Sequence, residues 1–221
     1  MIIVLLGACI FSALAAATHG SIADPVTVIA DLDGATVEQT FEMLQCVGAS
    51  HGEMFMWEDN RNHLRAIARD IGFSHVRGHG LLNDDMSTYL NGQTNMWTLF
   101  SAFDFLRSIH MRPIFELSFT PTELAKNQSD SLMHYRANAS PAKDLDQWFD
   151  FIKNLVQSLV DRYGIDEIRQ WRFEFYNEPN CGFFHGSKDE WFAMYNATAW
   201  AVKAVDSQIK VGGPSTAKLG V

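Results

Sequence analysis

The sequence contains few cysteines, and this scarcity limits the chemistry open to it. Cysteine occurs three times in 221 residues. Cys9 lies in the first apolar run, which leaves Cys46 and Cys181, too few for a disulfide framework, although a single bridge remains open. His185 follows Cys181 without a second pair of ligands, so neither cysteine belongs to a set with zinc-ligand spacing. We therefore expect no metal site.

The sequence also lacks a stripe or block of basic residues. It has 17 Lys and Arg against 26 Asp and Glu, a formal net charge of -9 that is spread over short acidic clusters. A nucleic-acid partner would require clustered positive charge. This balance predicts a protein without a nucleic-acid role, and it is compatible with a small uncharged substrate.

Only one long apolar run is present, at the start of the chain. "MIIVLLGACIFSALAAATHG" has small residues at Ala13, Ala15 and Ala17, the layout of a secretory signal with its cleavage site, although it has no Lys or Arg before the run. We interpret residues 1–17 as a signal peptide rather than an anchor, because the run is short for a membrane span. The mature protein is then expected outside the cell or in a lysosome-like compartment, with no membrane partner.

Three N-glycosylation sequons accompany this leader. They begin at Asn127, Asn138 and Asn196, and the second is weakened by the nearby Pro141. We predict that Asn127 and Asn196 carry glycans if the chain is secreted.

After an extended segment over residues 18–40, strand and helix patterns alternate along the chain. Capping, glycine and apolar-spacing signals set the expected bounds, with Pro141 in the first turn of one helix and a Ser187/Glu190 capping box opening another. The expected strands are 41–50, 73–82, 112–119, 172–176 and 209–214, and the expected helices are 61–71, 97–109, 141–163 and 187–202.

Such alternation predicts a parallel sheet, for which two architectures compete. A doubly wound dinucleotide-binding fold would show G-x-G-x-x-G at its first helix, but this chain has "GASHGEMF" there. A (β/α)8 barrel places polar residues after several strands, and here His79, Ser118, Asn177 and Glu178 follow three of them. We predict an α/β fold, a partial (β/α)8 TIM barrel of about the first five βα units over residues 41–221.

The densest chemical signal is "WRFEFYNEPN", which contains Glu174 and Glu178. Alternation places Glu174 and Glu178 on one face of a strand and Asn177 on the other, so the strand must bend if both Asn177 and Glu178 face a substrate. Glu174 is interpreted as a buried carboxylate paired with an arginine such as Arg77 or Arg172. Glu178, at the strand's tip among aromatic rings, suits a general acid whose pKa is raised by desolvation.

The segments "CVGAS", "VRGHGLLNDDM", "ELSFTPTELA", "FEFYNEPN" and "KVGGPSTA" together resemble glycoside hydrolase family 39, the β-xylosidases, with the α-L-iduronidases as a more distant branch. The resemblance covers residues 41–217 and implies a TIM-barrel glycosidase without a cofactor that acts on a carbohydrate. It implies that Glu178 is the general acid/base and that Asn177 contacts the hydroxyl beside the anomeric carbon. It further implies that His79 and Phe119 bind the sugar and that Arg77 lies near the nucleophile. Tyr176 stands where the family usually has Trp.

In the resembled family the nucleophilic glutamate comes from the seventh strand, beyond Val221. We therefore expect a truncated retaining exo-glycosidase of β-xylosidase type that lacks its nucleophile, since Glu116 or Asp84 would be a forced substitute. An iduronidase-like glycosidase and a non-catalytic carbohydrate-binding remnant remain the alternatives. Phe183 and Phe184 could stack on a sugar or simply hold their loop.

Overall fold

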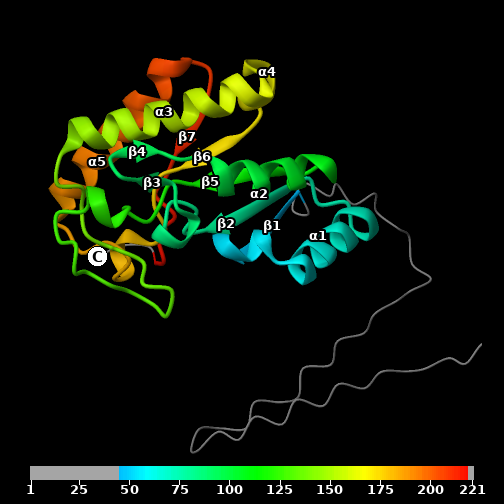
Figure 1. Cartoon of the computed structure of the whole chain (residues 1–221), viewed down its shortest axis with the longest axis horizontal. Coiled ribbons are helices and arrows are strands. Elements are labelled where there is room, and N and C mark those ends of the chain that lie inside the picture. Colours follow the sequence, from blue (N-terminus) through cyan, green and yellow to red (C-terminus); the bar gives the residue numbers. More distant parts are fainter. Residues whose placement is uncertain (1–44, 219–221) are drawn as a thin grey trace, which may run out of the picture. The chain divides into compact units, whose positions relative to one another are not determined.

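The computed structural model describes residues 45–218, which form a five-stranded parallel sheet (Figure 1). The predicted leader, residues 1–17, and the predicted extended segment, residues 18–40, lie outside the described residues. The strand order follows the sequence, and every neighbouring pair is parallel. The strands of this sheet are β1 (Cys46–His51), β2 (His75–His79), β5 (Arg112–Glu116), β6 (Arg172–Glu174) and β7 (Lys210–Gly212).

At least one helix connects each strand to the next. They are α1 (Glu58–Asp70), α2 (Trp97–Ser108), α3 (Leu145–Tyr163), α4 (Ile165–Ile168) and α5 (Lys188–Val205). A two-stranded antiparallel hairpin, β3 (Tyr89–Leu90) with β4 (Gln93–Thr94), precedes α2. Parallel neighbours joined by helices are the units of a (β/α)8 barrel. The predicted α/β class and the partial-barrel arrangement are confirmed.

Two helix starts show how local sequence sets the element bounds. The predicted capping box is present, because the Ser187 hydroxyl accepts from the Glu190 N–H while the Glu190 carboxylate accepts from the Ser187 N–H. The predicted start of α3 at Pro141 is wrong. The Asp144 carboxylate accepts from the N–H groups of Asp146 and Gln147 at 2.9 and 3.0 Å, so Asp144 is the N-cap.

The core lies between the sheet and its helices. From the helices, Phe103 and Leu106 of α2 and Trp148 of α3 are fully buried. From the strands, Phe115 and Phe173 meet them, with ring centroids of Phe103 and Phe115 5.2 Å apart. Burying a side chain of this size contributes about 1.5–3 kcal/mol, and these contacts hold the strand ends in register.

Trp97, the first residue of the predicted helix 97–109, is an apolar residue that lies off the buried face of α2. Its side chain is 84% exposed, although it begins α2. Leu99, Phe103 and Leu106 form the buried face instead. Because an α-helix has 3.6 residues per turn, an apolar residue in its first turn can point away from the buried face.

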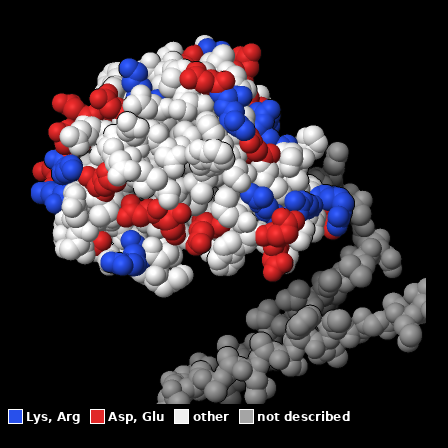
Figure 2. Space-filling model, in the orientation of Figure 1, with Lys and Arg blue, Asp and Glu red and all other residues white. Residues whose placement is uncertain are grey.

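The surface carries charges of both signs. On the face drawn in Figure 2, basic side chains lie beside acidic ones in several places and do not merge into one basic stripe. Within residues 45–218, no helix is long and apolar enough to cross a membrane. Cys46 and Cys181 are both free thiols, so the single bridge left open by the sequence is not formed between them.

Candidate active site at the strand ends

Three parallel strands deliver polar side chains to the same edge of the sheet. β2 ends at His79, β5 ends at Glu116 and β6 ends at Glu174, with Glu116 and Glu174 paired in register. Because the strands run in the same direction, their carboxyl ends share one edge, where open α/β sheets and barrels place their sites. The candidate site is therefore built at this edge.

Arg77 on β2 is the hub of the site. Its Nε donates to the Glu174 carboxylate at 2.9 Å, and its Nη2 donates to the same carboxylate at 2.7 Å. Nη2 also donates to Asn177 Oδ1 at 3.1 Å and forms a 2.9 Å ion pair with Glu116. The predicted pairing of Glu174 with an arginine is confirmed, and Arg77 is its partner.

Two carboxylates act on the charge state of this arginine. The hydrogen bond with Glu174 is the largest cause that raises the pKa of Arg77 above its ordinary value. Burial opposes this shift, and the negative charge of Glu116 adds to it. Arg77 is thus a permanent cation that holds Glu174, Glu116 and Asn177 in fixed positions.

Glu116, which the sequence suggested only as a forced substitute for the nucleophile, is a central residue of the site. Its side chain is fully buried, and its carboxylate accepts from the Gly80 N–H at 3.2 Å and from the Ser118 hydroxyl. His79 Nδ1 lies 3.1 Å from the same carboxylate. A charged residue inside the apolar segment "PIFELSF" was the available signal, since a buried carboxylate needs partners. Glu116 therefore orients His79 as well as Arg77.

The chain bends just after β6, as the sequence requires if Asn177 and Glu178 are both to face the site. Tyr176 and Glu178 have φ values of 71° and 40°, in the left-handed region. Such backbone costs of order 1–3 kcal/mol and persists where surrounding contacts fix it. Here the Glu178 N–H donates to the Ser215 carbonyl at 2.8 Å. The bend breaks strict alternation, so Glu174 and Asn177 both reach Arg77.

Glu178 differs from the other two carboxylates of the site. Glu178 is half-buried, and within residues 45–218 its carboxylate forms no hydrogen bond or ion pair. Tyr176, two residues before it, is fully buried, and this burial raises the pKa of the Tyr176 phenol. Glu178 is thus held by its backbone while its side chain remains free to act on a ligand.

Aromatic rings surround His79, the predicted sugar-binding histidine. Phe119, Phe183 and Tyr135 lie edge-on to its ring, with centroids at 5.2, 5.8 and 6.4 Å. Phe119 is fully buried, so it supports His79 from behind, and its direct contact with a sugar stays a prediction. Phe183 is half-buried beside His79, whereas Phe184 is buried against Tyr176 and holds the loop.

Tyr135 is a residue that the sequence analysis missed. It comes from the long loop after β5 and stacks on His51, the last residue of β1, at a centroid distance of 3.8 Å. Burial raises the pKa of Tyr135 to about 12, so its phenol keeps its proton at neutral pH. No spacing signal in the sequence links a loop tyrosine to β1.

Among the predicted residues, Arg77, Asn177 and Glu174 are in direct contact, and His79 joins them through Glu116.

The glycine pair at the end of β7, Gly212 and Gly213, supports the bend and gives a matched test of it. Gly213 has φ 134°, and a Cβ there would lie 2.5 Å from the Phe175 carbonyl oxygen. A Cβ on Gly212 would have no heavy atom within 4 Å. We expect Gly213→Ala to lower the free energy of unfolding by about 2–3 kcal/mol and Gly212→Ala to change it by less than about 1 kcal/mol. Urea denaturation of both variants measures this difference, and equal effects would contradict the geometry.

Comparison with known proteins shows which family the chain resembles in sequence. The sequence profile of glycosyl hydrolases family 39 matches residues 26–219. A β-xylosidase of Caldicellulosiruptor saccharolyticus is 39% identical over 180 residues, which are 78% of this chain and 37% of that enzyme. The α-L-iduronidase of Mus musculus is 26% identical over 166 residues, 72% of this chain and 24% of that enzyme.

A solved structure agrees with this assignment. The structure of a GH39 β-xylosidase from Caulobacter crescentus matches with a TM-score of 0.74 and 30% sequence identity, over 80% of this chain and 41% of that one. The chain therefore spans about two fifths or less of the relatives that it matches. The expected resemblance is confirmed, with the β-xylosidases more similar than the iduronidases. The chain belongs to glycosyl hydrolases family 39.

Proposed function

We propose that this chain provides the acid/base half of a retaining exo-glycosidase of β-xylosidase type. In this proposal Glu178 donates a proton to the leaving-group oxygen and then, as a base, activates the water that releases the sugar. The substrate is a xylo-oligosaccharide or another glycoside. Membership in the family and the greater similarity to β-xylosidases support this choice.

One observation carries the assignment of Glu178. Of the three carboxylates at the strand ends, Glu116 and Glu174 are tied to Arg77, at 2.9 and 2.7 Å. Within the described residues, the carboxylate of Glu178 forms no such contact. A general acid must exchange a proton with its substrate, which a carboxylate held in an ion pair does poorly. Glu178 is the carboxylate that meets this requirement.

The neighbouring residues take positioning roles in the proposal. Asn177 Oδ1 accepts from Arg77, which fixes the amide and leaves its NH2 group to donate to a sugar hydroxyl beside the anomeric carbon. His79, oriented by Glu116, contacts a second hydroxyl. Hydrogen bonds of this kind strengthen in the transition state of glycoside hydrolysis.

The nucleophile of the proposed reaction lies outside residues 45–218. A retaining glycosidase needs a second carboxyl group about 5–5.5 Å from the acid/base. Glu116 and Glu174 are engaged with Arg77, and Glu116 is fully buried, which leaves neither free to attack an anomeric carbon. A strand-end glutamate supplied by a longer form of the chain completes the pair.

The test is turnover of a panel of aryl glycosides by a longer form of the chain that carries the nucleophile, whereas the 221-residue chain alone is expected to have little or no activity. We expect hydrolysis of the aryl β-xyloside with retained anomeric configuration, and much slower hydrolysis of the aryl α-L-iduronide. Faster turnover of the iduronide would favour the iduronidase-like alternative. Binding of xylo-oligosaccharides without turnover of either substrate would identify a non-catalytic remnant and overturn the proposal.

We also propose that the protein is secreted after removal of residues 1–17 and is glycosylated at Asn127 and Asn196. Both residues are exposed, whereas Asn138 is 1% exposed. The Asn138 amide donates to the Asn127 carbonyl at 3.0 Å and accepts from the Ser140 N–H at 3.0 Å, so it has no room for a glycan.

We therefore expect protein secreted by a eukaryotic host to carry glycans at Asn127 and Asn196 and none at Asn138. Glycopeptide mass spectrometry measures the occupancy of each site, and sequencing of the mature N-terminus checks the cleavage. Occupancy at Asn138, or retention of the protein inside the cell with residues 1–17 intact, would contradict this proposal.

A further inference from the structure

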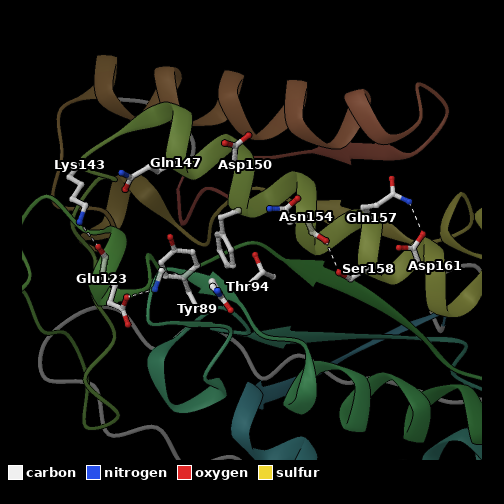
Figure 3. A pocket seen from close by; sticks show the side chains of 13 residues that line it. Tyr89, Thr94, Glu123, Lys143, Gln147, Asp150, Asn154, Gln157, Ser158 and Asp161 are labelled. Carbon is white, nitrogen blue, oxygen red and sulfur yellow. Dashed lines mark hydrogen bonds between the residues drawn. The ribbon is translucent and has the colours of Figure 1, made fainter.

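Two hollows on the helical layer adjoin each other, apart from the residues of the candidate site. One, of about 900 Å³, lies between the β3/β4 hairpin and the outer side of α3 (Figure 3). The other, of about 960 Å³, follows α2 and includes Trp97 and Arg162. Thr94 of the hairpin lines both. The helices α2 and α3 connect the inner strands β2, β5 and β6, so these hollows do not depend on either edge of the sheet.

Trp97 presents its indole to solvent from an anchored backbone. The residue is 84% exposed, and its backbone N–H donates to Asn95 Oδ1 at 3.3 Å. The Asn95 amide in turn donates to the Ser87 carbonyl at 2.7 Å, which anchors the start of α2. A flat, exposed indole on an ordered backbone offers apolar contact to a partner without an entropy cost of ordering the backbone.

The charged groups beside Trp97 already have partners. Arg162 Nε donates to Asp104 at 3.0 Å, and the guanidinium lies over the Phe100 ring at 4.5 Å. Arg61 donates to the Phe55 carbonyl at 2.7 Å and to the Ser101 hydroxyl at 3.1 Å. In this hollow Arg162 and Asp104 neutralise each other, and Arg61 is bonded to neutral oxygen atoms. A lining with one net charge and several hydrogen-bonding groups suits a neutral ligand rich in hydroxyls better than a highly charged one.

The hollow beside α3 adds a row of polar side chains. Gln147, Asp150, Asn154, Gln157 and Asp161 recur every three or four residues and so share one side of the helix. Figure 3 shows them following one another along α3, with Tyr89 and Thr94 of the hairpin across from them. At 1.5 Å per residue the row is about 21 Å long, which fits a chain better than a single ring.

We propose that Trp97 and this polar row form a non-catalytic binding surface for a neutral polysaccharide chain, separate from the site of Glu178. The indole face packs on one sugar ring, and the amides and carboxylates along α3 bind hydroxyls of the following rings. The choice of xylan as the polymer rests on the proposed function, whereas the binding surface itself rests on the groups described here.

Affinity electrophoresis of the full chain in gels with soluble xylan tests the proposal. Three variants are compared: Glu178→Gln, which slows hydrolysis of xylan, and the same variant with either Trp97→Ala or Trp200→Ala added. Trp200 is a matched control, because it is 71% exposed on α5 and lines neither hollow. We expect Trp97→Ala to weaken binding about tenfold and Trp200→Ala to leave it unchanged.

Equal effects of the two substitutions, or no effect of Trp97→Ala, would overturn the proposal. So would a change of oligomeric state in Trp97→Ala by sedimentation, since Trp97 would then cover a second copy of the chain. Hydrolysis of a small aryl xyloside separates this proposal from the catalytic one. Trp97→Ala alone should leave kcat/KM for the aryl xyloside unchanged. Failure of the catalytic proposal would appear as no turnover of the aryl xyloside, while xylan binding would still depend on Trp97.

Discussion

Replacing Arg77 with Met is expected to lower the free energy of unfolding by about 3–5 kcal/mol, because the substitution leaves buried carboxylates without their cation. Glu116 is fully buried, and Glu174 has only 16% of its side chain exposed. Both face the Arg77 guanidinium within 3 Å, at 2.9 and 2.7 Å. Urea denaturation followed by tryptophan fluorescence measures the loss.

Arg172→Met is the matched control for this prediction. Arg172 begins β6, is exposed, and within residues 45–218 its side chain forms no ion pair. Its replacement should change the stability by no more than about 0.5 kcal/mol. Arg77→Lys keeps the charge but loses the bidentate geometry, so a smaller loss is expected, and this variant covers the case in which Arg77→Met does not fold. Equal stability of all three variants would exclude Arg77 as the hub.

The second large effect is expected from Glu178→Gln. If Glu178 is the proton donor as proposed, kcat/KM of this variant for an aryl xyloside with a poor leaving group should fall by about 10²–10⁴. Glu58→Gln is the control, because Glu58 is an exposed residue of α1 whose 2.6 Å ion pair with Arg65 lies outside the site. A normal melting temperature of Glu178→Gln would show that the loss is chemical, since its side chain supports no contact within the described residues.

The order of the elements was predictable because it depends on local signals. Apolar spacing marked the helices, and the Ser187/Glu190 box set the start of α5. The start of α3 was wrong because Pro141 and Asp144 are both good starting residues, and only the tertiary contacts of 141–143 decide between them. The Lys143 N–H, for example, donates to the Leu124 carbonyl at 2.8 Å. A pattern in one segment carries no information about such a contact.

The candidate site was predictable only in part, for a similar reason. His79 ends β2, Asn177 and Glu178 follow β6, and Arg77 lies within β2. All four match family segments, so one-dimensional signals could propose them. The central place of Glu116 could not be derived in this way, because its partners Arg77 and His79 come from another strand. The sequence predicted a bend after β6 only on the condition that Asn177 and Glu178 both face the site. The left-handed backbone of this bend is held by the Ser215 carbonyl, far along the chain.

The most direct test of Glu178 as the acid/base is the dependence of kcat/KM on the leaving group. A series of aryl xylosides with phenols of decreasing acidity is hydrolysed by the longer form that carries the nucleophile and by its Glu178→Gln variant. Because kcat/KM reports the steps through cleavage of the glycosidic bond, it isolates the need for a proton on the leaving oxygen. We expect the variant to retain near-normal kcat/KM for the most acidic phenols and to lose progressively more as the phenol becomes less acidic. A loss of the same size across the whole series would contradict the role assigned to Glu178.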